Sequence, residues 1–148
     1  MKKQAYTMIA MIVLVGSMAM AAKAQTGGRI QLIANIPFEF SIGNKSLPAG
    51  EYTVRSISDD SRNVVLRIQS RDGKSSAMLL VGTVEGKAQE RAKLVFHRYG
   101  NQYFFAQAWV DGDSRGLEAQ KSRAERAAER EIAAIKMATA SVVVTARR

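Results

Sequence analysis

His97 is the only histidine of this 148-residue chain and the first residue to consider for acid–base or nucleophilic chemistry. It lies within an alternating apolar and polar segment, residues 93–99, which is typical of a β-strand, where a histidine is usually a packed or surface residue. Nucleophilic catalysis would also need a serine or cysteine beside a base. The chain has no cysteine and no Gly-x-Ser-x-Gly elbow. We therefore interpret His97 as structural and assign no catalytic residue.

The acidic residues do not form a metal-binding pattern. The loop at 111–116 begins like a calcium-binding loop, but Arg115 occupies the fifth position, which needs an oxygen ligand, and Ser122 the twelfth, which needs a glutamate. Asp59 and Asp60 are interpreted as solvated loop acids. Without cysteine and with one histidine, thiolate zinc sites and two-histidine motifs are excluded. The sequence predicts no metal site and no cofactor.

The aromatic residues give a candidate binding face. Tyr103, Phe105 and Trp109 share one face of the strand predicted at 102–110, and Arg98 lies opposite Tyr103 in the expected hairpin. Such a row packs the core in most β-proteins. Exposed to solvent, it stacks on sugar rings or lines an apolar cavity. Arg98, Tyr103, Phe105 and Trp109 are the candidate ligand-binding residues.

Residues 1–24 have the features of a secretory signal peptide. Lys2 and Lys3 precede a long apolar stretch, and Ala22-Lys23-Ala24 supplies a small-x-small cleavage pattern that makes Gln25 the expected mature N-terminus. An uncleaved membrane anchor is the alternative. The sequence therefore predicts export to the periplasm or the extracellular space, with no membrane span after cleavage.

The chain is basic, with 22 Lys and Arg against 13 Asp and Glu. Removing residues 1–24 takes away three lysines and no acid, so the net charge falls from +9 to +6. For an exported protein the available anions are lipid headgroups and envelope polysaccharides rather than nucleic acid. Ordinary solubilising charge is the alternative interpretation, because the chain has no run of five like charges.

Two turns determine the expected strand pairing. Asp72-Gly73 joins strands predicted at 64–70 and 75–84, and Gly100-Asn101 joins those at 93–99 and 102–110. The first turn pairs Ile68 with Ala77, Leu66 with Leu79 and Val64 with Val81, while Arg67 and Gln69 lie on the other face. The second pairs Arg98 with Tyr103, Phe96 with Phe105, Leu94 with Gln107, His97 with Phe104 and Val95 with Ala106.

Further strands are predicted at 29–36, 38–42 and 51–57, with a turn at Leu47-Pro48-Ala49-Gly50. The segment 102–110 is apolar on both faces and should be central in its sheet. We therefore expect an all-β domain, an antiparallel sandwich or small barrel of six to eight strands.

The periodicity changes after Gly116. Ser122 and Glu125 form a capping box for a helix over residues 122–138. Its expected apolar stripe is thin and comprises Ala124, Ala128, Ile132 and Ile135. This predicts a peripheral helix, and three valines in 141–145 suit a final strand. The predicted organisation is a signal peptide at 1–24, a β-domain at 25–116, and a C-terminal helix and tail at 117–148, so that truncation after Gly116 should leave the β-domain folded.

Three segments together resemble a family of small exported bacterial proteins that is uncharacterised. They are IPFEFSIG (36–43) with LPAGEYTV (47–54), KLVFHRYG (93–100) with YFF (103–105), and KSRAER (121–126). The resemblance covers about residues 30–131 and implies a β-rich exported domain. It implies no activity, and no functional residues can be transferred from it.

The sequence favours a non-enzymatic module that binds an envelope or extracellular ligand, polymer or protein. One alternative is a small hydrolase or isomerase, in which His97 would lie beside a carboxylate such as Glu39, Glu51 or Asp111. Another is a purely structural or oligomerising envelope protein that uses the C-terminal helix. Solvent exposure of the face formed by Tyr103, Phe105 and Trp109 would discriminate among these hypotheses.

Overall fold

The structure is a computed structural model that describes residues 30–57, 64–135 and 140–148. Its elements are β1 (Gln31–Ile36), β2 (Phe40–Ile42), β3 (Lys45–Leu47), β4 (Gly50–Ser56), β5 (Val64–Ser70), β6 (Ser76–Glu85), β7 (Lys93–Tyr99), β8 (Gln102–Trp109), β9 (Arg115–Ala119), α2 (Arg123–Ile135) and β10 (Ala140–Arg147). The predicted signal peptide and the acids Asp59 and Asp60 lie outside the described residues.

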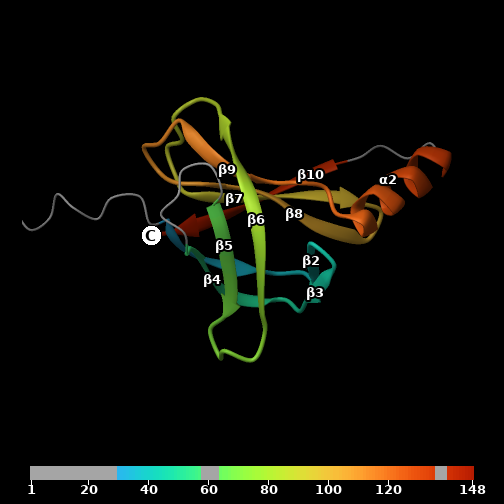
Figure 1. Cartoon of the computed structure of the whole chain (residues 1–148), viewed down its shortest axis with the longest axis horizontal. Coiled ribbons are helices and arrows are strands. Elements are labelled where there is room, and N and C mark those ends of the chain that lie inside the picture. The colour runs from blue at the N-terminus through green and yellow to red at the C-terminus, as the bar shows by residue number, and fades with distance from the viewer. Residues whose placement is uncertain (1–29, 58–63, 136–139) are drawn as a thin grey trace, which may run out of the picture.

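Eight strands close into an antiparallel barrel in the order β8-β7-β10-β1-β4-β5-β6-β9, because β9 pairs with β8 as well as with β6. The short strands β2 and β3 extend this sheet beside β8. In Figure 1, β5 and β6 cross in front of β7 and β8, and α2 projects beyond one end of the barrel. The prediction of an all-β antiparallel fold with a peripheral C-terminal helix is confirmed.

The interior of the barrel is filled by apolar side chains from alternating strand positions. Leu32, Val54, Leu66, Ile68, Leu94 and Phe96 have no exposed surface. Phe40 of β2 packs edge-to-face on Tyr52 and on Phe96, so the β2–β3 hairpin belongs to the same core. Among the described residues, no buried side-chain polar atom lacks a hydrogen-bond partner. An interior of this kind is a packed core, as in other eight-stranded barrels, and a polar ligand is better sought on the outside.

The first hairpin has the predicted register. Ile68 faces Ala77, Leu66 faces Leu79 and Val64 faces Val81, with the turn at Asp72-Gly73. Gly73 has a φ of 73°, a left-handed conformation that favours glycine.

The second hairpin has the predicted register only near its turn. Arg98 faces Tyr103, His97 faces Phe104 and Phe96 faces Phe105, but beyond a β-bulge Val95 faces Gln107 and Leu94 faces Ala108. The predicted pairs of Val95 with Ala106 and of Leu94 with Gln107 are therefore wrong. Ala106 is the extra residue of the bulge. Each later residue of β8 therefore points to the face of the sheet opposite to the one that uninterrupted alternation predicts.

The C-terminal strands belong to the barrel. β9 closes it between β6 and β8, and β10 lies between β7 and β1. The prediction that the β-domain ends at Gly116 is corrected by these pairings, because that boundary cuts through β9 and omits β10. The strand expected at 141–145 is confirmed within Ala140–Arg147.

The helix α2 lies on the outside of the barrel and begins where the sequence predicts. The amide of Glu125 donates to Ser122 Oγ at 3.0 Å, which confirms the N-cap. Its packed face differs from the expected stripe, since Glu125, Ala128 and Ile132 are covered while Ala124 and Ile135 are exposed. Ala128 packs with Tyr99 and Phe104, and Ile132 packs against the same cluster, so the face of α2 that meets the barrel follows Glu125, Ala128 and Ile132. No helix within the described residues is long and apolar enough to cross a membrane.

Candidate functional site

The structure does not bring the four predicted ligand-binding residues into one exposed row. Tyr103 is half-buried and stacks on Phe38, with ring centroids 4.0 Å apart and planes 14° apart. The guanidinium of Arg98 lies 5.6 Å from the Tyr103 ring, and its Nε donates to the Gly100 carbonyl at 2.8 Å. Phe105 is buried in the core. These three residues are engaged in packing.

Trp109 lies on the outer face because the bulge at Ala106 reverses the end of β8. It is only 6% exposed, since the chain passes over it at Gly86 and Gly116. A Cβ at Gly116 would lie 2.6 Å from Trp109 Cδ2, so the indole rests directly on glycine backbone. The indole Nε1 donates to Gln107 Oε1 at 3.0 Å. Trp109 is thus a buried anchor for β9.

His97 contacts the carboxylate of Glu125 and not one of the expected partners Glu39, Glu51 and Asp111. Its Nδ1 lies 2.7 Å from Oε1 of Glu125, and the Tyr99 hydroxyl donates to the same oxygen at 3.2 Å. Glu125 is 4% exposed. Burial raises the pKa of Tyr99, and the Glu125 carboxylate raises it further. Glu51, by contrast, is paired with arginines elsewhere.

The contact between His97 and Glu125 could not be read from the sequence. The capping-box pattern predicts that the Glu125 side chain returns to the backbone of Ser122, whereas in the fold it points onto β7. An imidazole oriented by a carboxylate is one part of an acid–base site. Here its immediate structural effect is to join α2 to the barrel, since Glu125 belongs to the helix and His97 to β7. Among the described residues, no group of three or more His, Asp or Glu could hold a metal ion.

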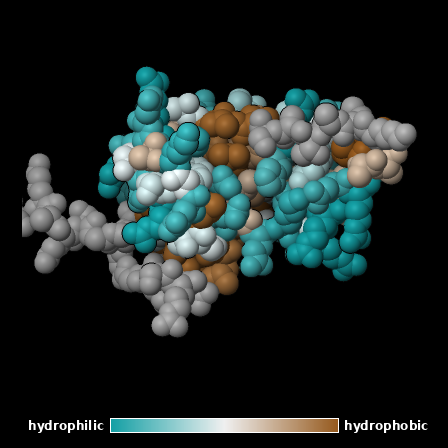
Figure 2. All heavy atoms as spheres, turned by 90° about the horizontal axis from the view of Figure 1, so that it is seen from above, coloured by the Kyte–Doolittle hydropathy of each residue, from teal (hydrophilic) through white to brown (hydrophobic). Residues whose placement is uncertain are grey.

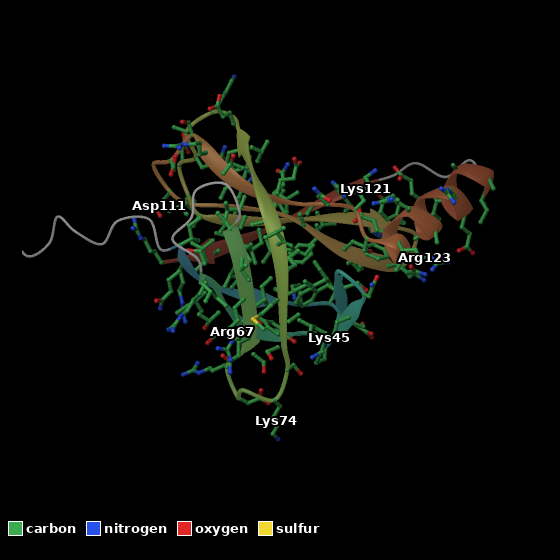
Figure 3. All side chains as sticks on the ribbon, viewed as in Figure 1. Lys45, Arg67, Lys74, Asp111, Lys121 and Arg123 are labelled. Carbon is green, nitrogen blue, oxygen red and sulfur yellow. The ribbon has the colours of Figure 1, made fainter. Side chains whose placement is uncertain are left out.

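The candidate site is a groove of about 290 Å³ on the outer face of β4 and β5. Its lining residues are Thr53, Arg55, Arg67, Gln69, Ser70 and Arg71. Thr53, Arg55, Arg67 and Gln69 point outward because they alternate with the buried core positions of the same two strands, and Ser70 and Arg71 lie where β5 ends. The β4–β5 register places Thr53 opposite Gln69 and Arg55 opposite Arg67. Figure 3 shows Arg67 on β5 in the part of the barrel that also carries Lys45 and Lys74, at a distance from Asp111.

The groove carries an excess of positive charge. Glu51 uses one carboxylate oxygen for Arg71, at 3.0 Å, and the other for Arg147, at 3.4 Å. In the part of the chain that the structure describes, no carboxylate pairs with Arg55 or Arg67. Of the three arginines that line the groove, only Arg71 therefore has an acidic partner among the described residues. Like charges placed directly opposite on neighbouring strands are unfavourable, so a bound anion would stabilise the pair formed by Arg55 and Arg67.

The end of the groove next to the β5–β6 turn is held by polar contacts. Ser70 Oγ donates to Asp72 Oδ1 at 2.6 Å and accepts from the Ser75 amide at 2.9 Å. The hydroxyl of Ser70 and the amide of Lys74 keep the pKa of Asp72 below its ordinary value. The amide of Arg71 donates to the Glu51 carbonyl at 2.9 Å, which fixes Arg71 beside β4.

The sequence predicts only part of this site. The Asp72-Gly73 register assigned Arg67 and Gln69 to the face away from the core, which the structure confirms. Arg55 lies on another strand, and its position opposite Arg67 depends on the β4–β5 register. No short turn determines that register in the sequence, so the arginine pair was missed. Its only signal was outward-facing arginines on two predicted strands.

Comparison with known proteins adds no relative. No protein-family model, no curated protein sequence and no solved structure matches this chain. The resemblance to uncharacterised exported proteins stays a prediction from the three sequence segments.

Proposed function

We propose that this chain is an exported, non-enzymatic module that binds an anionic ligand in the groove between β4 and β5. The observation that carries the proposal is the cross-strand pair of Arg55 and Arg67, which has no carboxylate partner among the described residues. Two planar guanidinium groups side by side suit the oxygen atoms of a carboxylate, sulfate or phosphate. The neighbouring Thr53 and Gln69 offer neutral polar contacts on the same face.

Binding rather than catalysis is favoured by what surrounds the groove. Among the described residues, its lining contains arginine, threonine, glutamine and serine, and no histidine or acid that would serve as a general acid or base. His97 is occupied by Glu125 on another part of the barrel. The anions available to an exported protein are envelope polymers and lipid headgroups, and both carry such groups.

The test is binding of a soluble polyanion, dextran sulfate, to the chain from Gln25 to Arg148, which contains every described residue. The double variant Arg55→Gln/Arg67→Gln should lose most of the affinity, and the affinity of the unchanged chain should fall as salt is raised. Arg123→Gln/Arg130→Gln is the matched control, because it removes the same charge from exposed positions of α2. Equal loss in the two double variants would contradict the proposal, since binding would then follow net charge alone.

A further inference from the structure

A row of exposed apolar residues runs beside the arginine pair on the outer face. The Ile57 amide donates to the Val65 carbonyl at 2.8 Å, and Val65 faces Leu80, so these residues form one row across β5 and β6. The neighbouring row is Arg55, Arg67 and Met78, again in direct register. Successive outward positions on a strand are about 7 Å apart, so the apolar and basic rows are adjacent.

The apolar residues of these rows are unusually exposed. Ile57 is 46% exposed, Leu80 59% and Met78 66%, whereas Ala77, Leu79 and Val81 on the opposite face of β6 are partly or fully covered. Figure 2, which views the molecule from above, shows hydrophobic residues at the middle of its lower edge, the side on which β5 and β6 lie in front in Figure 1, and a larger hydrophobic area in the upper middle of the view. Clustered exposed apolar side chains bordered by polar groups mark interaction surfaces.

Resting on the proposed anion-binding function, we infer that this face docks on the surface of an anionic lipid bilayer. Arg55 and Arg67 bind headgroup phosphates, and Ile57, Met78 and Leu80 enter the boundary between headgroups and acyl chains. Lys45, whose Nζ donates to the Ser76 carbonyl at 2.6 Å, adds a cation at the border of the same face. Phosphate and hydrocarbon occur in one lipid at the short separation that the two rows present.

Two other kinds of partner, an anionic polysaccharide and a second copy of this chain, fit this face less well. A polysaccharide would neutralise the arginines but leave Met78 and Leu80 in water. A second copy of the chain, related by a twofold axis through this face, would bring the unpaired Arg55 and Arg67 of the two copies close together, which is unfavourable. An anionic lipid surface satisfies both rows at once.

The test compares vesicle sedimentation with dextran sulfate binding for the same variants of the chain from Gln25 to Arg148. Vesicles of phosphatidylcholine are used with and without phosphatidylglycerol. Met78→Thr/Leu80→Thr should weaken binding to the anionic vesicles about tenfold and leave dextran sulfate binding unchanged. Threonine keeps β-propensity, and both sites are exposed, so the barrel should stay folded. Val143→Thr is the matched control, because Val143 is 56% exposed on β10, away from the groove.

Each outcome decides between the two proposals. Three results would overturn docking on an anionic membrane: no binding to vesicles, equal binding to vesicles that lack phosphatidylglycerol, or unchanged vesicle binding by Met78→Thr/Leu80→Thr. In each case, dextran sulfate binding alone tests the anion site. Dextran sulfate binding that Arg55→Gln/Arg67→Gln does not weaken overturns the anion site itself. Selective loss of vesicle binding in the apolar variant supports docking on lipid.

Discussion

Oε1 of Glu125 lies 2.7 Å from Nδ1 of His97, and this contact joins the first turn of α2 to the middle of β7. The same carboxylate oxygen accepts from Tyr99. One buried acid thereby fixes the position of a helix that has few large apolar side chains on its packed face.

We expect Glu125→Gln to destabilise the protein by about 1–3 kcal/mol, because a neutral amide replaces a buried carboxylate that accepts two hydrogen bonds. Urea unfolding followed by Trp109 fluorescence measures the change. Glu131→Gln is the control, since Glu131 is exposed on the same helix.

His97→Gln should cost no more stability than Glu125→Gln, and the double variant should cost less than the sum of the two because both changes remove one contact. The single variant His97→Gln should leave dextran sulfate binding unchanged. If a hydrolase or isomerase activity were detected and then lost on this substitution with the barrel intact, the non-enzymatic proposal would be wrong.

Gly116→Ala should destabilise the barrel by roughly 1–3 kcal/mol, because the new Cβ would lie 2.6 Å from the buried indole of Trp109. Gly82→Ala is the matched control on the neighbouring strand β6, where a Cβ meets nothing within 4 Å. Thermal unfolding of the two variants compares them directly. A midpoint for Gly116→Ala as high as that for Gly82→Ala would show that the indole moves at little cost.

Removal of residues 136–148 should abolish the folded barrel. β10 pairs with β7 on one side and with β1 on the other, so its loss leaves two long unpaired strand edges and opens the core around Leu94. Circular dichroism and the cooperativity of thermal unfolding are the measurements. A truncated chain that still unfolds cooperatively would restore the separation between a β-domain and a dispensable tail.

Asp72 should contribute stability that depends on pH in one direction. Its pKa is below the ordinary value of 3.8, because the Ser70 hydroxyl and the Lys74 amide donate to the carboxylate. A lowered folded-state pKa gives a contribution that is complete above 3.8 and is lost as the pH falls through the folded-state pKa. Asp72→Asn should therefore lower the thermal midpoint at neutral pH and match the unchanged chain in strong acid. A difference that persists unchanged in strong acid would contradict this assignment.

Local signals in the sequence predicted the all-β class, the turn at Asp72-Gly73 and eight of the strand positions, and the structure bears these out, but they missed β3 and β9. They succeed because alternation and turn chemistry act between neighbouring residues. The N-cap at Ser122 is correct for the same reason. The prediction fails at Ala106, because a bulge is selected by what packs on both sides of β8, including the glycines that accommodate Trp109.

By itself the sequence determined the β-rich pattern, the basic charge, the absence of cysteine and the local start of α2. Only the tertiary structure decided that β10 completes the barrel, that Glu125 meets His97, and that Arg55 lies opposite Arg67. These three features depend on contacts between segments that are distant in the chain or joined by no short turn. Barrel closure selects such contacts collectively, through the packing of the whole core, and no local pattern of residues specifies them.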